Sequence, residues 1–413
     1  MKALIFSVSA GGGHGRAAEA VKDYIDIYSP GSCVKIIDTL KYINPIIDKV
    51  IIGSYLKTIK ITPSLFGKLY DYSETDYGLA TISSKFNEIM TYRLLPLINE
   101  FDPDILIATH PFPTEMLSIL KIKHKIEIPT VSILTDYAPH SFWLHPCIDA
   151  YVVSNADMIP EMVSKGIPKN TIYDIGIPVC PEFLKQYDRN KTLTEINFST
   201  TKPTVLIMGG SLGMGKIETI YEELLFSDDD FQILVITGNN KKLYYELMKY
   251  QNSYYTCKKT YIIGFTDNVN KYMQASDLLL TKPGGLTITE ALICKIPIGI
   301  FSPIPGQEEK NAEFLLKHNL AINLSKKETA NAQVVDLLFN TDRMREIKLS
   351  CDKFSKPYVG RDLFNLITRL INKNNYTPDY KDDDYKKKDS NNKGFFKSIQ
   401  KQFLKTAEKL FSM

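Results

Sequence analysis

A histidine follows three glycines near the start of the chain, in the stretch SVSAGGGHGRAAEA at residues 7–20. The apolar run before the glycines is typical of a β-strand and the stretch after them of a helix, so His14 stands at a strand-to-helix turn. Gly12 and Gly13 allow the backbone to approach a ligand, and the first N–H groups of the helix attract an anion. An imidazole placed there can remove a proton from a substrate hydroxyl. The alternatives are a histidine that caps the helix or one that only packs in the core.

Glycine-rich turns recur in the second half of the chain. MGGSLGMGKI places Gly210, Ser211 and Gly213 between a predicted strand and a predicted helix. TKPGGLTITEAL forms a second such turn, with Lys282, Gly284, Gly285 and Thr287. Neither these turns nor the first one matches a nucleotide P-loop or the GxGxxG motif. Backbone N–H groups at the start of a helix nevertheless favour binding of a diphosphate.

Carboxylate and amide side chains follow these turns. Glu290 is expected on the first turn of the helix after TKPGG, where it could accept both hydroxyls of a ribose or simply complement the helix dipole. Gln307 and Glu308 open the next helix, in PIPGQEEKNAEF. Such groups suit the hydroxyls of a sugar, although a QEE run is also an ordinary helix start. Together these groups predict a site for a nucleoside diphosphate.

The segments GGGHGRAAEA, KPGGLTITEAL and PIPGQEEKNAEFL resemble the monogalactosyldiacylglycerol synthase and processive diacylglycerol glucosyltransferase family (glycosyltransferase family 28), over roughly the first 370 residues. The resemblance implies a two-domain GT-B fold, a UDP-sugar donor, inversion at the anomeric carbon and no metal or other cofactor. It implies that His14 is the general base, that the main chain near Phe265 meets uracil and that Glu290 binds ribose. The glycine turns would bind the pyrophosphate, and Gln307 and Glu308 the sugar.

Four further side chains fall near the same predicted strand ends as His14. Asp136, in LTDYAPHSFWLHP, could orient His14 or the acceptor, with a structural cap as the alternative. His110 and His145 are expected in the wall of the acceptor site or in ordinary packing. Trp143, the single tryptophan, has the same two interpretations.

Strands and helical patterns alternate through both halves of the 413-residue chain, and 44% of its residues are apolar. This predicts an α/β protein with two Rossmann-like, doubly wound domains that face a cleft. The expected parts are an N-terminal acceptor and membrane-side domain (1–182), an interdomain linker (183–202), a C-terminal UDP-sugar-binding domain (203–372), a disordered linker (373–392) and a basic amphipathic helix (393–413).

Composition excludes several classes of function. The net charge is only +3 and the basic residues of the body are dispersed, which argues against nucleic-acid binding. The six cysteines lie far apart without a CxxC pair, so we expect neither a zinc site nor a disulfide framework. The chain starts directly with a strand and has no run of 18 apolar residues, so we expect it to be neither secreted nor membrane-spanning.

Two segments could contact lipid. In residues 393–413, lysines recur every four residues opposite a sector rich in phenylalanine, which predicts a helix that anchors on an anionic membrane surface. The alternative is a helix that docks on the body of the protein. Residues 41–77 mix bulky apolar residues with lysines and could form packed helices or a lipid-facing surface.

These observations predict a peripheral enzyme at the cytoplasmic face of the cell membrane. Its expected partners are a UDP-hexose, diacylglycerol and the anionic bilayer, and it would transfer glucose or galactose to diacylglycerol, once or processively. The alternatives are transfer of N-acetylglucosamine to a polyprenyl-linked acceptor, a UDP-sugar-sensing protein without turnover, and a UDP-sugar epimerase on the same architecture.

Overall fold

The computed structural model describes residues 1–9, 12–44, 90–124, 126–210, 213, 215–253, 258–324 and 330–372. The predictions for Ser211, for residues 373–413 and for most of the 41–77 segment therefore lie outside the described residues. No helix within the described ranges has the length and apolar character needed to cross a membrane.

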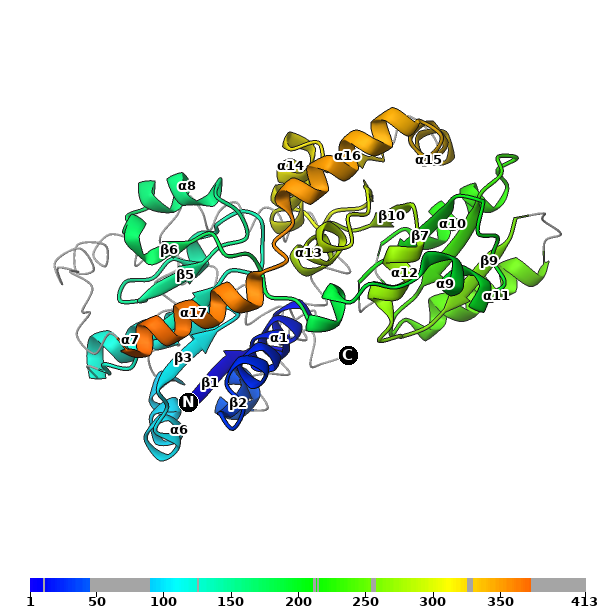
Figure 1. The fold of residues 1–413 in the computed structure, drawn as a ribbon. Coiled ribbons are helices and arrows are strands. Elements are labelled where there is room, and N and C mark those ends of the chain that lie inside the picture. The colour runs from blue at the N-terminus through cyan, green and yellow to red at the C-terminus, as the bar shows by residue number, and fades with distance from the viewer. Residues whose placement is uncertain are drawn as a thin grey trace, which may run out of the picture.

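The first half of the chain builds a six-stranded parallel sheet with the order β2-β1-β3-β4-β5-β6 (Figure 1). Its elements in chain order are β1 (Lys2–Ser7), α1 (Gly13–Tyr28), β2 (Cys33–Asp38), α2 (Thr39–Ile43), the 3₁₀ helix η1 (Tyr92–Leu94), α6 (Leu95–Phe101), β3 (Ile105–Ala108), α7 (Pro111–His124), β4 (Thr130–Ile133), η2 (Ser141–Trp143), β5 (Ala150–Val152), α8 (Met158–Ser164), η3 (Lys169–Thr171), β6 (Ile172–Tyr173) and η4 (Pro181–Leu184).

The second half builds another six-stranded parallel sheet, with the order β12-β11-β10-β7-β8-β9. Its elements are α9 (Arg189–Glu195), β7 (Thr204–Met208), α10 (Ile217–Leu225), β8 (Gln232–Ile236), α11 (Lys241–Ser253), β9 (Thr260–Ile263), α12 (Val269–Ala275), β10 (Leu278–Thr281), α13 (Gly285–Ile293), β11 (Ile298–Ile300), α14 (Gln307–Lys317), β12 (Ala321–Asn323), α15 (Ala330–Leu338) and α16 (Thr341–Phe354). A last helix, α17 (Val359–Asn372), ends the described chain.

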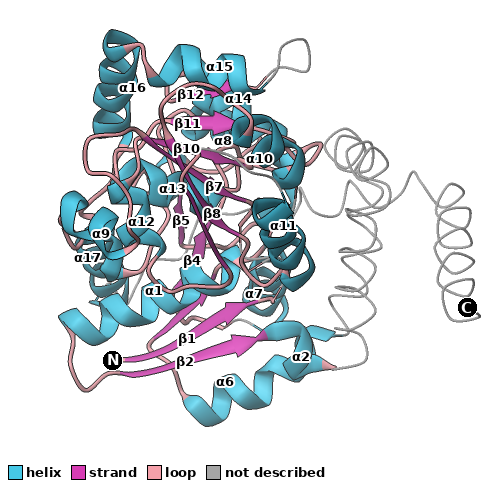
Figure 2. Ribbon diagram, turned by 90° about the vertical axis from the view of Figure 1, so that its right-hand side faces the viewer, coloured by secondary structure: helices cyan, strands magenta, loops and turns pink. Residues whose placement is uncertain are grey.

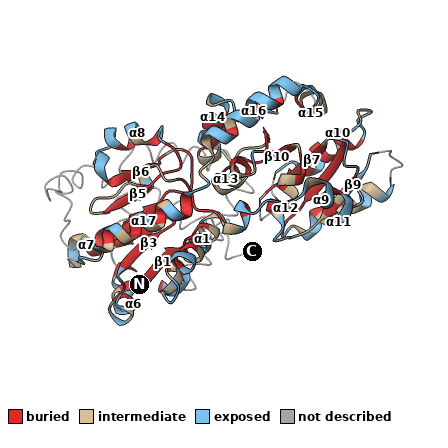
Figure 3. Ribbon diagram, in the orientation of Figure 1, coloured by how far each residue is buried: buried red, intermediate tan, exposed pale blue. Residues whose placement is uncertain are grey.

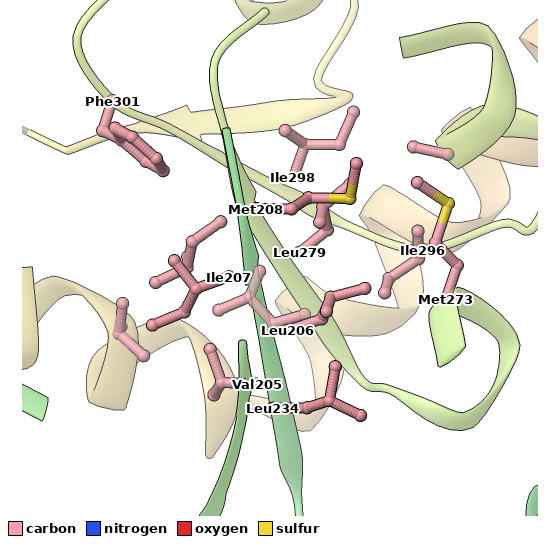
Figure 4. Close-up of a cluster of buried hydrophobic side chains, with 14 of the residues drawn as sticks. Val205, Leu206, Ile207, Met208, Leu234, Met273, Leu279, Ile296, Ile298 and Phe301 are labelled. Carbon is pink, nitrogen blue, oxygen red and sulfur yellow. The ribbon is translucent and has the colours of Figure 1, made fainter. Parts of the chain in front are cut away.

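Most strands are largely buried because their sequences are almost continuously apolar, whereas the edge strand β2 (CVKIID) stays partly exposed. TVLIM in β7 and QILVI in β8 are buried at every position, as expected for parallel strands covered on both faces. Figure 2 shows helices around the strands of both sheets, and Figure 3 shows the strands buried beneath helices with exposed outer faces. In Figure 4, residues 205–208 of β7 lie among Leu234 of β8 and Leu279 of β10 in the second core. The predicted α/β class with two parallel sheets is confirmed.

Helix α17 returns to the first half, where it lies beside α1 (Figure 1). Its apolar stripe, which includes Leu363 and Ile367, packs in the core of the first sheet with Ile5. At its start, a Cβ on Gly360 would lie 2.1 Å from the ring of Tyr24 in α1, so only glycine fits this contact. The prediction that all of 203–372 belongs to the second domain is therefore wrong for this helix.

The predicted linker 183–202 is also corrected by the structure. It contains α9, and Leu193 and Phe198 are buried in the core of the second half. Ile177 and Val179 already belong to that core. This polar stretch packs on the second half because its few apolar residues are buried in that core. The chain therefore leaves the first sheet after β6.

Candidate active site

Three neighbouring strands of the first sheet end at the same place. His14 follows β1, Thr109 follows β3 and Thr135 follows β4, and these strands are adjacent in the order β1-β3-β4. The carboxyl ends of parallel strands form the ligand-binding edge of such a sheet. The fold therefore places two threonines from distant parts of the sequence next to His14.

The imidazole of His14 is held through its Nδ1 atom. Nδ1 lies 2.9 Å from the carbonyl oxygen of Thr109 and 2.9 Å from Oγ1 of Thr135. Because a carbonyl can only accept, Nδ1 carries the hydrogen and donates it. Thr109 Oγ1 in turn donates to the carbonyl oxygen of His14 at 3.0 Å, which fixes the start of α1. Among the described residues nothing hydrogen-bonds Nε2, so this nitrogen can accept a proton from a ligand.

The surroundings of His14 keep the ring neutral. Burial lowers the pKa of His14 from its ordinary value of 6.5 to about 4, although the Thr109 carbonyl acts in the opposite direction. The ring of His110 lies edge-on at a centroid distance of 4.5 Å, and a second positive charge there would repel the first. At neutral pH, His14 is thus in the unprotonated form that a general base requires.

Asp136 has a different position from the one that would orient His14. Gln307 Nε2 donates to its Oδ2 at 2.6 Å, and Asn311 Nδ2 lies 3.3 Å from its Oδ1. Burial raises the pKa of Asp136, and the two amides lower it. Asp136 thus connects the two halves, while the orienting contacts to His14 come from Thr109 and Thr135. A role of Asp136 toward the acceptor stays a prediction.

Asn311 is a buried residue that the motifs did not single out. Its Oδ1 accepts from the N–H of Tyr137 at 2.8 Å, and its Nδ2 donates to the carbonyl of Pro283 at 3.0 Å. It lies four residues after Gln307 on α14, hence on the same face of that helix. This spacing was the one sequence signal that could have found it.

Lys282 and Glu308 form a buried pair at the edge of the second sheet. Lys282 Nζ lies 3.0 Å from Glu308 Oε1, and the N–H of Ile304 donates to Oε2 at 2.7 Å. Burial raises the pKa of Glu308, while Lys282 lowers it. Gly284, the N-cap residue of α13, lies beside this pair. Both oxygens of Glu308 therefore have protein partners, and its predicted contact with the sugar would add to these bonds.

Glu290 lies on the second turn of α13, because the helix begins at Gly285. The prediction of a first-turn position is wrong, and with it the interpretation of Glu290 as a simple partner of the helix dipole. Burial raises the pKa of Glu290 to about 8, and the charge of Arg16 opposes that rise. Within the described part of the chain no hydrogen bond engages its carboxyl group, and Thr287 is a half-buried residue of the same helix. The contact of this carboxyl group with the ribose hydroxyls stays a prediction.

The start of α1 faces the loop after β9 across a hollow. Arg16 lies 3.9 Å from Asp267, and its guanidinium carbon is 5.9 Å from the ring centre of Phe265, which is 52% exposed. Gly12, Arg16 and Asp267 line a hollow of about 470 Å³. Gly12 has φ 91° as N-cap of α1, and Gly13 follows as its first residue. Phe265 itself lines a separate hollow of about 500 Å³ together with Gly238 and Gly264. Its contact with uracil stays a prediction.

The turn after β7 depends on glycine. Gly210 and Gly213 have φ values of 68° and 56°, in the region that side chains disfavour. A Cβ on Gly213 would lie 2.2 Å from the carbonyl oxygen of Thr237 at the end of β8. The turn is therefore pressed against the next strand end, and its predicted contact with pyrophosphate stays untested.

Trp143 and His145, which were both predicted near the acceptor site, have different surroundings. Trp143 is buried with its ring centre 6.2 Å from that of His14, so it packs beside the histidine. Its place in the wall of an acceptor site stays a prediction. His145 instead donates from Nε2 to the carbonyl of Phe142 at 2.8 Å, within its own loop.

Two facing parallel α/β units of this kind define the GT-B fold. Solved structures of similar fold include Anabaena Alr3699/HepE in complex with UDP-glucose, with TM-score 0.53 and 14% identity over 89% of this chain and 100% of that one. Acinetobacter baumannii MurG matches with TM-score 0.58 and 14% identity over 89% and 99%.

The chain belongs to the processive diacylglycerol β-glucosyltransferase family. The monogalactosyldiacylglycerol (MGDG) synthase model matches residues 14–179, and the glycosyltransferase family 28 C-terminal domain matches residues 204–351. The processive diacylglycerol β-glucosyltransferase of Bacillus pumilus is 29% identical over 91% of this chain and 97% of its own. That of Staphylococcus carnosus is 30% identical over 67% and 70%. The predicted family is confirmed.

Proposed function

We propose that this protein is an inverting glycosyltransferase that moves a glucosyl group from UDP-glucose to the free hydroxyl of diacylglycerol. The observation that carries the proposal is His14, whose Nδ1–H is fixed by the Thr109 carbonyl while Nε2 stays available. The acceptor is supported by the names of the full-length relatives, and so is glucose as the sugar.

The proposed reaction is a single displacement at the anomeric carbon. The hydroxyl oxygen of diacylglycerol forms the new bond to C1 while the bond from C1 to the β-phosphate oxygen breaks, and UDP leaves with that electron pair. His14 Nε2 takes the hydroxyl proton. The resulting imidazolium keeps its Nδ1–H bonded to the carbonyl oxygen of Thr109 and faces the Thr135 hydroxyl, so the new positive charge is hydrogen-bonded.

The donor would lie against the second sheet. Glu290 would form hydrogen bonds with the ribose hydroxyls, and the N-terminus of α13 and Lys282 would lie near the departing phosphate charge. We propose that these groups stabilise UDP without a metal ion, since helix N-termini and a lysine supply positive charge where it develops. The ion pair with Glu308 fixes the position of the Lys282 ammonium group.

Product analysis tests the proposal. Purified protein is incubated with diacylglycerol vesicles and UDP-glucose, UDP-galactose or UDP-N-acetylglucosamine, and the lipids are analysed by mass spectrometry. We expect hexosyl-diacylglycerol from UDP-glucose, with dihexosyl species if the enzyme is processive. Protein that binds UDP but forms no diacylglycerol product with any donor would contradict the proposal and favour a polyprenyl acceptor or a sensor.

The pH profile of kcat/KM should show an acid limb well below the ordinary pKa of histidine. This parameter reports the free enzyme, in which His14 must be neutral and has a pKa of about 4. The rate should therefore hold as pH falls through 6.5 and decline only toward pH 4. Circular dichroism at each pH gives the control for unfolding. An acid limb close to 6.5 in folded protein, below the Glu290 pKa of about 8, would show that His14 is not the proton acceptor.

Attachment to the cytoplasmic face of the membrane stays a proposal that rests on the basic, phenylalanine-rich pattern of residues 393–413. Removing these residues should reduce sedimentation with anionic vesicles and lower lipid glycosylation, while UDP affinity stays at the level of the full chain. Unchanged sedimentation of the shortened protein would contradict the anchor.

A further inference from the structure

His110 is a buried histidine at the end of the strand next to that of His14, and the mechanism above does not use it. It follows Thr109 directly after β3, and its ring meets that of His14 at a centroid distance of 4.5 Å and an interplanar angle of 70°. The ring of Phe112 stacks on that of His110 at a centroid distance of 5.3 Å and an interplanar angle of 13°. The position of His110 is thus fixed by aromatic contacts next to the proposed base.

The hydrogen bonds give the two histidines opposite tautomers. The N–H of Phe112 donates to Nδ1 of His110 at 3.2 Å, so this nitrogen carries no hydrogen and the neutral ring has its hydrogen on Nε2. In His14 the hydrogen is on Nδ1. Burial and the neighbouring His14 hold the pKa of His110 well below its usual range, so the ring stays neutral. Among the described residues, neither Nε2 has a hydrogen-bond partner.

We propose that His110 binds the acceptor hydroxyl by donating its Nε2–H to the same oxygen whose proton His14 removes. The oxygen of an alcohol offers one hydrogen and two lone pairs. The hydrogen would go to His14 and one lone pair would accept from His110, which leaves the second lone pair directed at the sugar. A pair of rings with one acceptor and one donor therefore matches a hydroxyl group and holds it in an attacking orientation. This inference rests on the proposed function.

A capping role accounts for only one of the two ring nitrogens. His110 precedes α7, and its bond from the Phe112 N–H caps that helix through Nδ1. The proposed role uses Nε2. The substitution His110→Asn separates the two, because asparagine is a good N-cap residue and its side-chain oxygen can replace Nδ1, while nothing replaces Nε2–H. His110→Gln is the conservative variant, whose amide can present an N–H farther from the backbone.

The test compares an alcohol with a thiol. Wild-type protein, His110→Asn and His110→Gln are assayed with diacylglycerol and with its 3-thiol analogue, since sulfur is a weak hydrogen-bond acceptor. We expect His110→Asn to lower kcat/KM for diacylglycerol about tenfold or more and to leave that for the thiol nearly unchanged, at wild-type UDP affinity and melting temperature. His110→Gln should recover part of the loss.

An equal loss on both acceptors, or no loss on diacylglycerol, would overturn the role of His110 and leave the proposed function intact. Wild-type protein that glycosylates neither acceptor would instead overturn the proposed function, and this inference with it. If His110→Asn does not fold, the ratio of alcohol to thiol activity in His110→Gln decides, because the proposal requires that ratio to fall below the wild-type value.

Discussion

Replacing His14 by alanine is expected to lower the rate of sugar transfer by about 10²- to 10⁴-fold, the range over which a positioned general base contributes. The Nε2 atom of His14 is the proton acceptor of the proposed reaction, and His110 carries a hydrogen at the corresponding position, so it cannot take over this task. UDP affinity should stay within a few-fold of wild type, because the predicted donor contacts lie mainly in the second half. Initial rates and calorimetric UDP binding measure both quantities.

The variant His14→Gln is the matched control. Its amide can still donate toward the Thr109 carbonyl but has no basic nitrogen, so it should be as inactive as alanine. If transfer continues near the wild-type rate in either variant, another group must accept the proton.

Both substitutions should also change the stability of the protein in acid. The folded pKa of His14, about 4, lies below its unfolded value of 6.5, so the unfolded chain binds more protons between these values. Wild-type stability therefore falls as pH drops from 6.5 toward 4, and is unaffected by this group above 6.5. In His14→Ala this part of the loss is absent, and melting temperatures at pH 7 and pH 5 should differ less than in wild type.

The sequence was most informative where one segment carries both the pattern and the chemistry. An apolar run, a glycine turn and a helix predicted the strand end at which His14 lies, because burial of a parallel strand requires an apolar run. The same reasoning placed Gln307 at the start of a helix that follows a strand of the second half.

Features that depend on distant contacts could not be predicted in this way. Thr109 and Thr135 are ordinary residues in the sequence, and only the strand order β1-β3-β4 brings them to His14. The packing of α17 on the first sheet could not be predicted either. The sequence of an amphipathic helix shows that it has an apolar face, but not which surface of the protein that face covers. Asp136 was recognised as a strand-end carboxylate, but its amide partner Asn311 lies in the other half.

The two halves meet through a network of hydrogen bonds between buried polar side chains. Tyr137 Oη lies 2.9 Å from Thr289 Oγ1, and Asp136 is bonded by Gln307 and Asn311 across the same boundary. Buried polar groups of this kind are stable only when each finds its partner, so the network fixes the relative position of the halves. Gly285 packs against the backbone of Thr135 and Asp136 at this boundary.

Replacing Gly285 by alanine should therefore impair catalysis without unfolding either half. A Cβ there would lie 2.0 Å from the carbonyl oxygen of Thr135, and this neighbour is backbone that cannot rotate away. Thr135 also contacts His14 through its hydroxyl, so relief of the clash must move either the base or the whole second half. A displacement of about 1 Å can cost about 10²-fold in rate, and we expect a loss of kcat of that order.

Gly15→Ala provides the matched control for the Gly285 variant. No atom lies within 4 Å of the Cβ that it would add in α1, so the melting temperature should stay at or above that of wild type. Gly285→Ala should melt close to wild type too, because each sheet keeps its own core, and should lose transfer activity selectively. A Gly285→Ala protein with wild-type kcat would show that the halves need not approach this closely during the reaction. Loss of activity with retained melting behaviour would instead identify the contact between Gly285 and Thr135 as the point where the donor half is aligned with His14.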